Sequence, residues 1–66
     1  MQITVNGEAR EISVGETLLA LLARLEIDAR KVAVERNLAI VPKGNYADTA
    51  LAPGDVIEIV HFIGGG

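Results

Sequence analysis

One segment of the chain has the spacing of an amphipathic helix, and it constrains the fold more than any other feature of the sequence. Its apolar stripe falls at positions i, i+3, i+4 and i+7 and consists of Leu18, Leu21, Leu22 and Leu25. Thr17 stands immediately before the stripe and is predicted to cap the helix, which we expect to end near Leu25 or Glu26. A single helix with one apolar face needs a second layer to cover it.

The segments around the helix have the pattern of β-strands. Residues 1–6 alternate between apolar and polar, and the pair Asn6-Gly7 that follows is typical of a tight hairpin turn. Residues 8–14 predict the returning strand, with Ile12 and Val14 on the same face. Three further strands are expected, over residues 32–35, 38–41 and 56–62.

The stretch between the last two strands has no clear period. Pro42 closes the preceding strand, which suits a strand end at the edge of a sheet. We expect a loop over residues 43–52, with one helical turn anchored by Tyr46 and Leu51, and then a tight turn over residues 53–55.

The order strand, strand, helix, strand, strand, strand predicts an α+β fold, a small mixed sheet with one main helix packed on one face. This is the β-grasp arrangement. The residues expected to face the helix are Ile3, Val5, Ile12, Val14, Val32, Val34, Ile57 and Ile59. In the last strand Glu58 should face solvent, and by strand parity Val56, Val60 and Phe62 share that outward face.

Size and composition narrow the classes of function. The 66 residues are expected to form a single domain over residues 1–66. The sequence has no cysteine, which excludes thiolate nucleophiles and Cys-ligated metal centres, and its net charge of −3 argues against nucleic-acid binding. No apolar run approaches the roughly 18–20 residues of a membrane span, and the first residues lack the pattern of a secretory signal. We therefore expect a cytoplasmic protein without a membrane partner.

The sequence finishes with Gly64, Gly65 and Gly66, shortly after its most strand-prone segment. Such an ending can be a frayed terminus or an artefact of the expressed sequence. The functional alternative is that Gly66 offers its own α-carboxylate as the reacting group. Glycine suits this role because a chain without side chains can thread a narrow channel and adopt backbone angles closed to other residues. We expect residues 63–66 to form a flexible tail on which a partner enzyme acts.

Short motifs spread over the whole chain agree with one known family. They are Val5-Asn6-Gly7-Glu8, Gly15-Glu16-Thr17-Leu18, Leu21-Leu22, Val32-Ala33-Val34-Glu35, Asn37, Ile40-Val41-Pro42-Lys43, Pro53-Gly54-Asp55 and Ile59-Val60-His61-Phe62-Ile63-Gly64-Gly65-Gly66. On these motifs the sequence resembles the ThiS family, the sulfur carriers of thiazole formation in thiamine biosynthesis, which belong with the MoaD proteins to the ubiquitin-like β-grasp superfamily. Tyr46 stands where Trp is expected, and Arg36 where an apolar residue is common, and both departures concern packing.

The resemblance implies a sequence of reactions carried out by partners. An E1-like adenylyltransferase of the ThiF type would use ATP to convert the Gly66 carboxylate into an acyl-adenylate. Sulfur from a persulfide donor would displace AMP and leave a C-terminal thiocarboxylate. Thiazole synthase, of the ThiG type, would take that sulfur. The chain itself would be a carrier and co-substrate, not an enzyme, and would bind no cofactor of its own.

Partner docking is expected next to the tail, on the outward face of the last strand at Val60 and Phe62, and Ile63 is expected to take part in it. Exposed apolar residues beside a reactive end often mark a contact site, and an aromatic side chain is a typical anchor. The alternative for Phe62 is that its ring folds back onto the sheet edge.

The remaining candidates favour structural roles. By parity His61 should point inward near the end of the sheet, where a lone histidine is usually packed or hydrogen-bonded. A nucleophile pair of Ser13 with His61 has no third group to orient it. The nine carboxylates are dispersed, so no metal site is predicted, and Arg30-Lys31 is interpreted as a solvated loop.

Four alternatives remain open from the sequence. The small subunit of molybdopterin synthase shares the fold and the chemistry of the tail. A ubiquitin-like modifier would join its activated Gly66 to lysine amines instead of sulfur. A regulatory β-grasp binding module would need no free glycine terminus. A stand-alone enzyme is the least favoured, because the chain is short of catalytic groups and of volume for a pocket.

Overall fold

The computed structural model describes residues 1–62 of the chain. The predicted flexible tail over residues 63–66, with Ile63, Gly64, Gly65 and Gly66, lies outside the described residues. In chain order the elements are β1 (Gln2–Val5), β2 (Glu8–Glu11), α1 (Leu18–Arg24), the 3-10 helix η1 (Ala29–Lys31), β3 (Val32–Arg36), β4 (Ala39–Val41), the 3-10 helix η2 (Lys43–Asp48) and β5 (Val56–His61).

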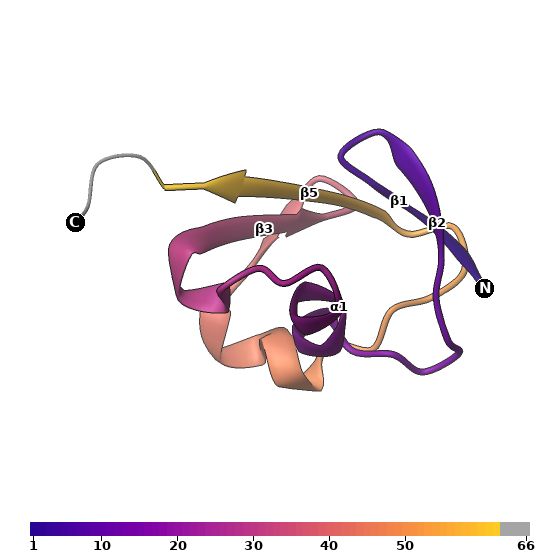
Figure 1. Cartoon of the computed structure of the whole chain (residues 1–66), viewed down its shortest axis with the longest axis horizontal. Helices are drawn as coiled ribbons and strands as arrows, with labels where there is room; N and C mark the ends of the chain where they lie inside the picture. Colours follow the sequence, from indigo (N-terminus) through magenta and orange to yellow (C-terminus); the bar gives the residue numbers. More distant parts are fainter. Residues whose placement is uncertain (63–66) are drawn as a thin grey trace.

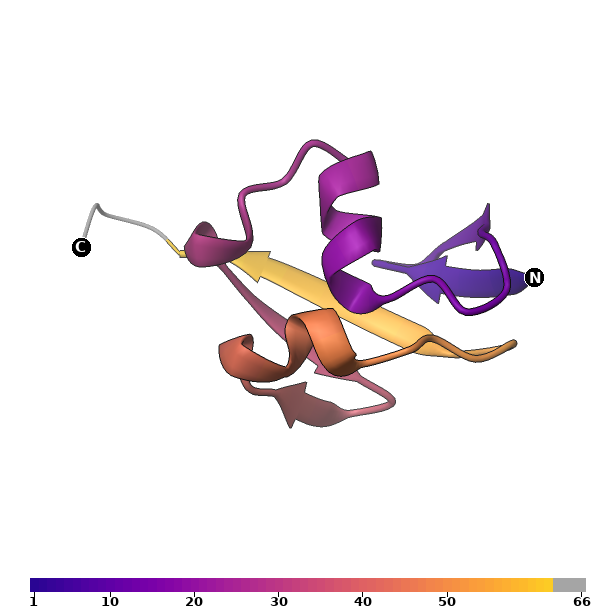
Figure 2. The ribbon, with the colours of Figure 1, turned by 90° about the horizontal axis from the view of Figure 1, so that it is seen from below.

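The strands form one mixed sheet in the order β2-β1-β5-β3-β4. Strand β5 lies in the middle, parallel to β1 and antiparallel to β3, while the two hairpins β1–β2 and β3–β4 flank it. Helix α1 and η2 cover the same face of this sheet, and the other face carries no helix among residues 1–62 (Figure 1, Figure 2). The α+β β-grasp prediction is therefore confirmed.

The hairpin and the helix form where the sequence predicts them. Asn6 and Gly7 turn between β1 and β2 with φ of 48° and 83°, values that asparagine and glycine tolerate better than other residues. The hydroxyl of Thr17 accepts a hydrogen bond from the N–H of Ala20 at 3.1 Å, which caps α1 at its start. The helix ends at its C-cap Leu25, as expected from the end of the leucine stripe.

The core lies between α1 and the inner face of the sheet. Leu18, Leu21 and Leu22 are fully buried, and Leu25 packs at the margin. They meet a set of buried strand and loop residues, namely Ile3, Val5, Ile12, Val32, Val34, Tyr46, Leu51, Ile57 and Ile59. Tyr46 and Leu51 anchor the segment after β4, as predicted. No helix among the described residues is long and apolar enough to cross a membrane.

The returning strand is shorter than predicted, and Val14 does not belong to the core. Strand β2 ends at Glu11, and Ile12 makes one more pairing through its N–H to the carbonyl of Met1 at 2.8 Å. The chain then turns, with Gly15 at φ 82° and the N–H of Glu16 donating to the carbonyl of Ser13 at 3.1 Å. Val14 sits on the outside of this turn with 86% of its surface exposed. The alternation of residues 8–14 continues past the point where the chain leaves the sheet.

The strand predicted over residues 38–41 loses its first residue to a turn. Asn37 and Leu38 connect β3 with β4 and have φ of 52° and 72°. Leu38 is consequently exposed at the tip of the hairpin. Pro42 follows directly after β4, which is an edge strand, in agreement with its missing N–H donor.

Candidate functional site at the end of the last strand

Strand β5 leads to the predicted reactive tail, and its neighbours hold it along its length. On one side, β3 pairs with β5 from Arg36↔Ile57 to Val32↔His61. At the end of this ladder the N–H of Phe62 donates to the carbonyl of Lys31 at 2.9 Å. The last described residue of the chain is thus tied to the sheet, at the end that lies away from the N-terminus (Figure 1).

The side chain of Asn6 extends the pairing of β1 with β5 by one step. Asn6 follows β1, and its own N–H donates to the carbonyl of Ile57 at 2.9 Å. Its Oδ1 accepts from the N–H of Ile59 at 2.7 Å, and its Nδ2 donates to the carbonyl of Ile59 at 3.2 Å. The amide therefore satisfies both main-chain groups of Ile59 on the side where β1 has ended. The sequence indicated Asn6 only as a turn residue, because no local pattern reveals a contact across 53 positions.

The two faces of β5 follow the predicted parity. Ile57 and Ile59 are buried against the core. Val56 and Val60 face outward together with Glu58, and the exposed fractions of Val60 and of Phe62, which follows the strand, are 62% and 59%. Two of the three predicted docking residues, Val60 and Phe62, therefore lie on an accessible face. The third, Ile63, lies outside the described residues.

The ring of Phe62 is held from one side by a cation. The ammonium group of Lys43 lies 4.7 Å from the centre of the ring, within the range of a cation–π contact. The same Nζ donates to the carbonyl of Arg30 at 2.6 Å, so Lys43 connects η2, η1 and the end of β5. Phe62 is thus oriented beside the tail while more than half of its surface stays open. The ring thus has both an intramolecular contact and an open surface.

His61 is exposed, so the expectation of a packed histidine is wrong. It pairs with Val32 at the end of the ladder with β3, beyond the last residue of β1 that pairs with β5. At this position β1 therefore no longer flanks β5, and the imidazole of His61 is left exposed. Ser13 lies beyond β2, at the opposite end of the sheet, so the two residues cannot form a nucleophile pair.

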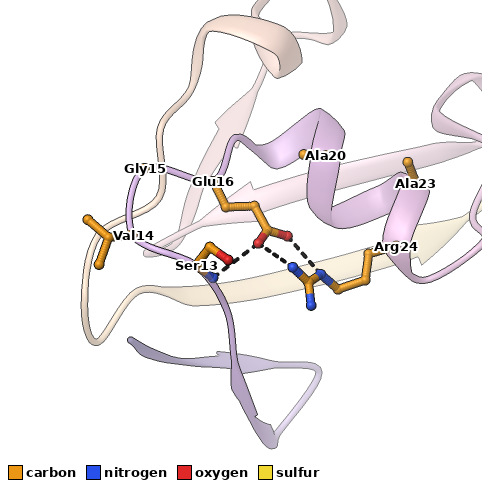
Figure 3. Close-up of a pocket in the computed structure, with 7 residues that line it drawn as sticks. All are labelled: Ser13, Val14, Gly15, Glu16, Ala20, Ala23 and Arg24. Atoms are coloured by element: carbon orange, nitrogen blue, oxygen red, sulfur yellow. Dashed lines mark hydrogen bonds and ion pairs between the residues drawn. The ribbon is translucent and has the colours of Figure 1, made fainter.

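A shallow hollow lined partly by polar side chains lies beside the start of α1 (Figure 3). Its lining residues are Ser13, Val14, Gly15, Glu16, Ala20, Ala23 and Arg24. The carboxylate of Glu16 accepts from Arg24 Nη2 at 2.7 Å, from Arg24 Nε at 3.0 Å and from the N–H of Ser13 at 3.1 Å. Burial alone would raise the pKa of Glu16, but these hydrogen bonds from Arg24 and Ser13 hold that pKa below its ordinary value. The two charged side chains of the hollow thus satisfy each other.

The short 3-10 helix η1 before β3 is organised by a local ion pair at its start. The carboxylate of Asp28 accepts from the N–H of Arg30 at 2.9 Å and from its guanidinium at 2.9 and 3.1 Å. Hydrogen bonds from the Arg30 side chain and N–H lower the pKa of Asp28 to about 2. Arg30 and Lys31 are exposed, as predicted, but they belong to the 3-10 helix η1 and not to a loop. Within residues 1–62, no group of three His, Asp or Glu side chains is placed to hold a metal ion.

Comparison with known proteins gives one consistent family. The model of the ThiS family matches residues 3–66. The thiazole synthase of Paramagnetospirillum magneticum is 58% identical over 66 residues, which are all of this chain and 20% of that protein. The sulfur carrier protein ThiS of Bacillus subtilis is 48% identical over 50 residues, 76% of each chain. The chain thus spans about a fifth of the length of the thiazole synthase that it matches.

A solved structure agrees in fold over the whole length. The crystal structure of a thiamine biosynthesis protein, ThiS, from Geobacter metallireducens superposes with a TM-score of 0.86 at 30% sequence identity. The match covers all of this chain and all of that one.

Proposed function

This chain belongs to the ThiS family, and on that premise we propose that it carries sulfur for thiamine biosynthesis as a thiocarboxylate on Gly66. The observation that carries the proposal is the extent of the family match, which runs to residue 66 and so includes the three terminal glycines. The full-length agreement with the ThiS protein of Geobacter metallireducens supports the same reading.

The proposed chemistry needs activation of a poor electrophile. An adenylating enzyme joins the Gly66 carboxylate to AMP from ATP and releases pyrophosphate. A persulfide then attacks the carbonyl carbon and displaces AMP, and cleavage of the sulfur–sulfur bond by a thiol leaves the thiocarboxylate. The missing side chain at Gly66 leaves both faces of the carbonyl open to the nucleophile.

In this proposal the chain is a co-substrate, and its partners supply the catalytic groups. ATP is bound by the adenylating enzyme, and no cofactor is assigned to the chain. Its own contribution is to present the tail from a fixed point. The pairing of Phe62 with Lys31, the contact of Phe62 with Lys43 and the clamp of Asn6 on Ile59 support this role.

We propose that the adenylating enzyme and thiazole synthase dock next to the tail, at Val60 and Phe62, and also contact the tail residue Ile63. The exposed apolar surface of Val60 and Phe62 supports this placement. The occurrence of a matching sequence in a thiazole synthase supports the choice of partner.

The test is the intact mass of the chain after incubation with the adenylating enzyme, ATP and a sulfur source. We expect a mass shift equal to the replacement of one oxygen by sulfur, located at Gly66 by fragmentation, and lost again on addition of thiazole synthase with its other substrates. An unchanged mass, or a shift at another residue, would contradict the proposal. The mass of the protein isolated from its own cells also shows whether Gly66 is the terminal residue there.

Two controls separate the alternatives. Omission of ATP should abolish the shift, because the free carboxylate is a poor electrophile. Products of higher mass with lysine-containing proteins would instead indicate a ubiquitin-like modifier.

A further inference from the structure

Two carboxylates stand side by side on the outer face of the sheet. Glu35 of β3 and Glu58 of β5 are directly opposite each other in the strand register. Both point away from the core, because their neighbours Val34 and Ile59 are buried on the inner face. Side chains at such paired positions have Cβ atoms about 4.5–5.5 Å apart, and like charges there destabilise the sheet.

Neither of these carboxylates forms an ion pair within residues 1–62. Other carboxylates of the chain do have close cationic partners, as in the pairs Glu16–Arg24, Asp28–Arg30 and Asp55–Arg36. The four arginines of the described chain thus pair with other carboxylates, and Glu35 and Glu58 remain side by side without an ion-pair partner among residues 1–62.

Apolar side chains surround this pair. Ile40 is opposite Glu35 on β4, and Val56 and Val60 lie two residues to either side of Glu58 on β5. All three are exposed, Ile40 to 66%. We call this surface the outer patch, formed by Ile40, Val56 and Val60 around Glu35 and Glu58.

We propose that the outer patch receives a cationic side chain, an arginine in particular, from the partner enzyme that takes the tail. This inference rests on the proposed function and names what the partner must present. An arginine fits because its planar guanidinium has five donors and can bond two carboxylates at once. The apolar rim would exclude water from the contact, which strengthens the attraction between the charges.

The charges also decide which occupant the outer patch accepts. A second copy of this chain stacked on the same face would bring its carboxylates against these carboxylates, and like charges at an interface are strongly unfavourable. A partner with a cation at the centre of an apolar surface is complementary instead. The patch is continuous with the predicted docking residues, since Glu58 and Phe62 are four residues apart, or about 13 Å along a strand.

The test compares two charge-matched variants of the full chain. Glu35→Gln combined with Glu58→Gln neutralises the pair with little change of shape. Glu26→Gln combined with Asp48→Asn neutralises two exposed carboxylates outside the outer face, which also form no ion pair in the described chain. Binding to the purified adenylating enzyme and to thiazole synthase is measured by calorimetry at several salt concentrations.

We expect the Glu35/Glu58 variant to bind at least one of the two enzymes about tenfold or more weakly, with a flatter salt dependence. The Glu26/Asp48 variant should stay within about twofold of the parent, because exposed charges away from the contact are screened. The melting temperature of the Glu35/Glu58 variant should equal or exceed that of the parent, since a repulsion has been removed. A purely structural role would not lower affinity while stability rises.

Unchanged affinity of the Glu35/Glu58 variant for both enzymes would overturn the inference. The inference would also be overturned if that variant self-associated while its enzyme binding stayed unchanged. That result would mean that the two carboxylates prevent copies of the chain from associating. Conversion of the parent to the thiocarboxylate serves as the reference. If the parent is converted and the variant binds equally well, only this inference fails, whereas an unconverted parent contradicts the proposed function itself.

Discussion

On the inner face of β5, Ile57 and Ile59 are buried under α1, whereas Val60 on its outer face and Phe62 just beyond its end are more than half exposed. The two sets alternate along one strand of six residues and the residue after it. The inner side chains contribute to folding, because burial of an aliphatic side chain stabilises by about 1.5–3 kcal/mol. The outer side chains add little to folding and are available to other proteins. Substitutions on the two faces should therefore change different measurements.

The largest effect on stability is expected in the core that faces the inner side of the sheet. Leu22→Ala should lower the free energy of unfolding by about 2–5 kcal/mol, through lost burial and the cavity that remains. Urea denaturation monitored by circular dichroism measures this change. Leu19→Ala, at an exposed position of the same helix, should cost much less. A loss below about 1 kcal/mol for Leu22→Ala would show that the stripe is not the core.

The next largest loss of stability is expected from neutralising Asp55, a buried carboxylate immediately before β5. The carboxylate of Asp55 accepts from the N–H of Ala52 at 2.9 Å, from Asn37 Nδ2 at 3.1 Å and from Arg36 Nε at 2.9 Å. Asp55→Asn cannot accept all three and should cost about 1–3 kcal/mol in free energy of unfolding. Equal stability of this variant and the parent at pH 7 would contradict the structural role of Asp55.

The same group predicts how stability depends on pH. Burial raises the pKa of Asp55, but the hydrogen bonds from Ala52, Asn37 and Arg36 outweigh it and lower that pKa. A carboxyl with a lowered pKa in the folded state stabilises the protein above its unfolded pKa of about 3.9. The contribution is lost as the pH falls through the folded pKa. Urea denaturation from pH 7 to acid should therefore show a steeper loss below about pH 4 in the parent than in Asp55→Asn.

A smaller loss of stability is expected when the side-chain amide of Asn6, which bonds Ile59 just beyond the end of β1, is removed. Asn6→Gly keeps the positive φ of this turn residue and removes only the two side-chain bonds to Ile59. The free energy of unfolding should fall by about 1 kcal/mol. Hydrogen exchange at the amide of Ile59 should accelerate, while that of Ile3 in β1 should follow only the global change. Unchanged protection at the Ile59 amide would show that the Asn6 side chain does not stabilise this part of β5.

The outer face should give the smallest change in stability and a large change in binding. Phe62→Ala should alter the free energy of unfolding by no more than about 1 kcal/mol, the size of its exposed cation–π contact with Lys43. Its affinity for the adenylating enzyme should fall about tenfold or more, because exposed aromatic residues are typical anchors of interfaces. Val14→Ala, at an exposed site at the other end of the sheet, is the matched control and should bind normally. If Phe62→Ala lost stability and bound the enzyme as well as the parent, Phe62 would contribute to folding and not to docking.

The two faces of β5 could be predicted from the sequence, whereas the contacts between strands could not. The leucine spacing and the alternation around Glu58 are local, so α1 and the two sides of β5 could be predicted. Val14 could not be placed, because alternation does not reveal where a chain leaves its sheet. His61 has the inward parity that was predicted, but β1 no longer pairs beside it. The Asn6 clamp and the opposition of Glu35 to Glu58 depend on strand order and register, which no local pattern contains.

The most direct test of the account uses a chain that is extended by one alanine after Gly66. Neither face of the sheet is changed, so the free energy of unfolding should equal that of the parent. The added residue moves the carboxylate by up to about 3.3–3.6 Å and brings a side chain to the reacting end. Because a displacement of about 1 Å can cost a hundredfold in rate, ATP–pyrophosphate exchange with the adenylating enzyme should fall at least that far. Exchange as fast as with the parent would contradict the assignment of Gly66 as the reacting residue.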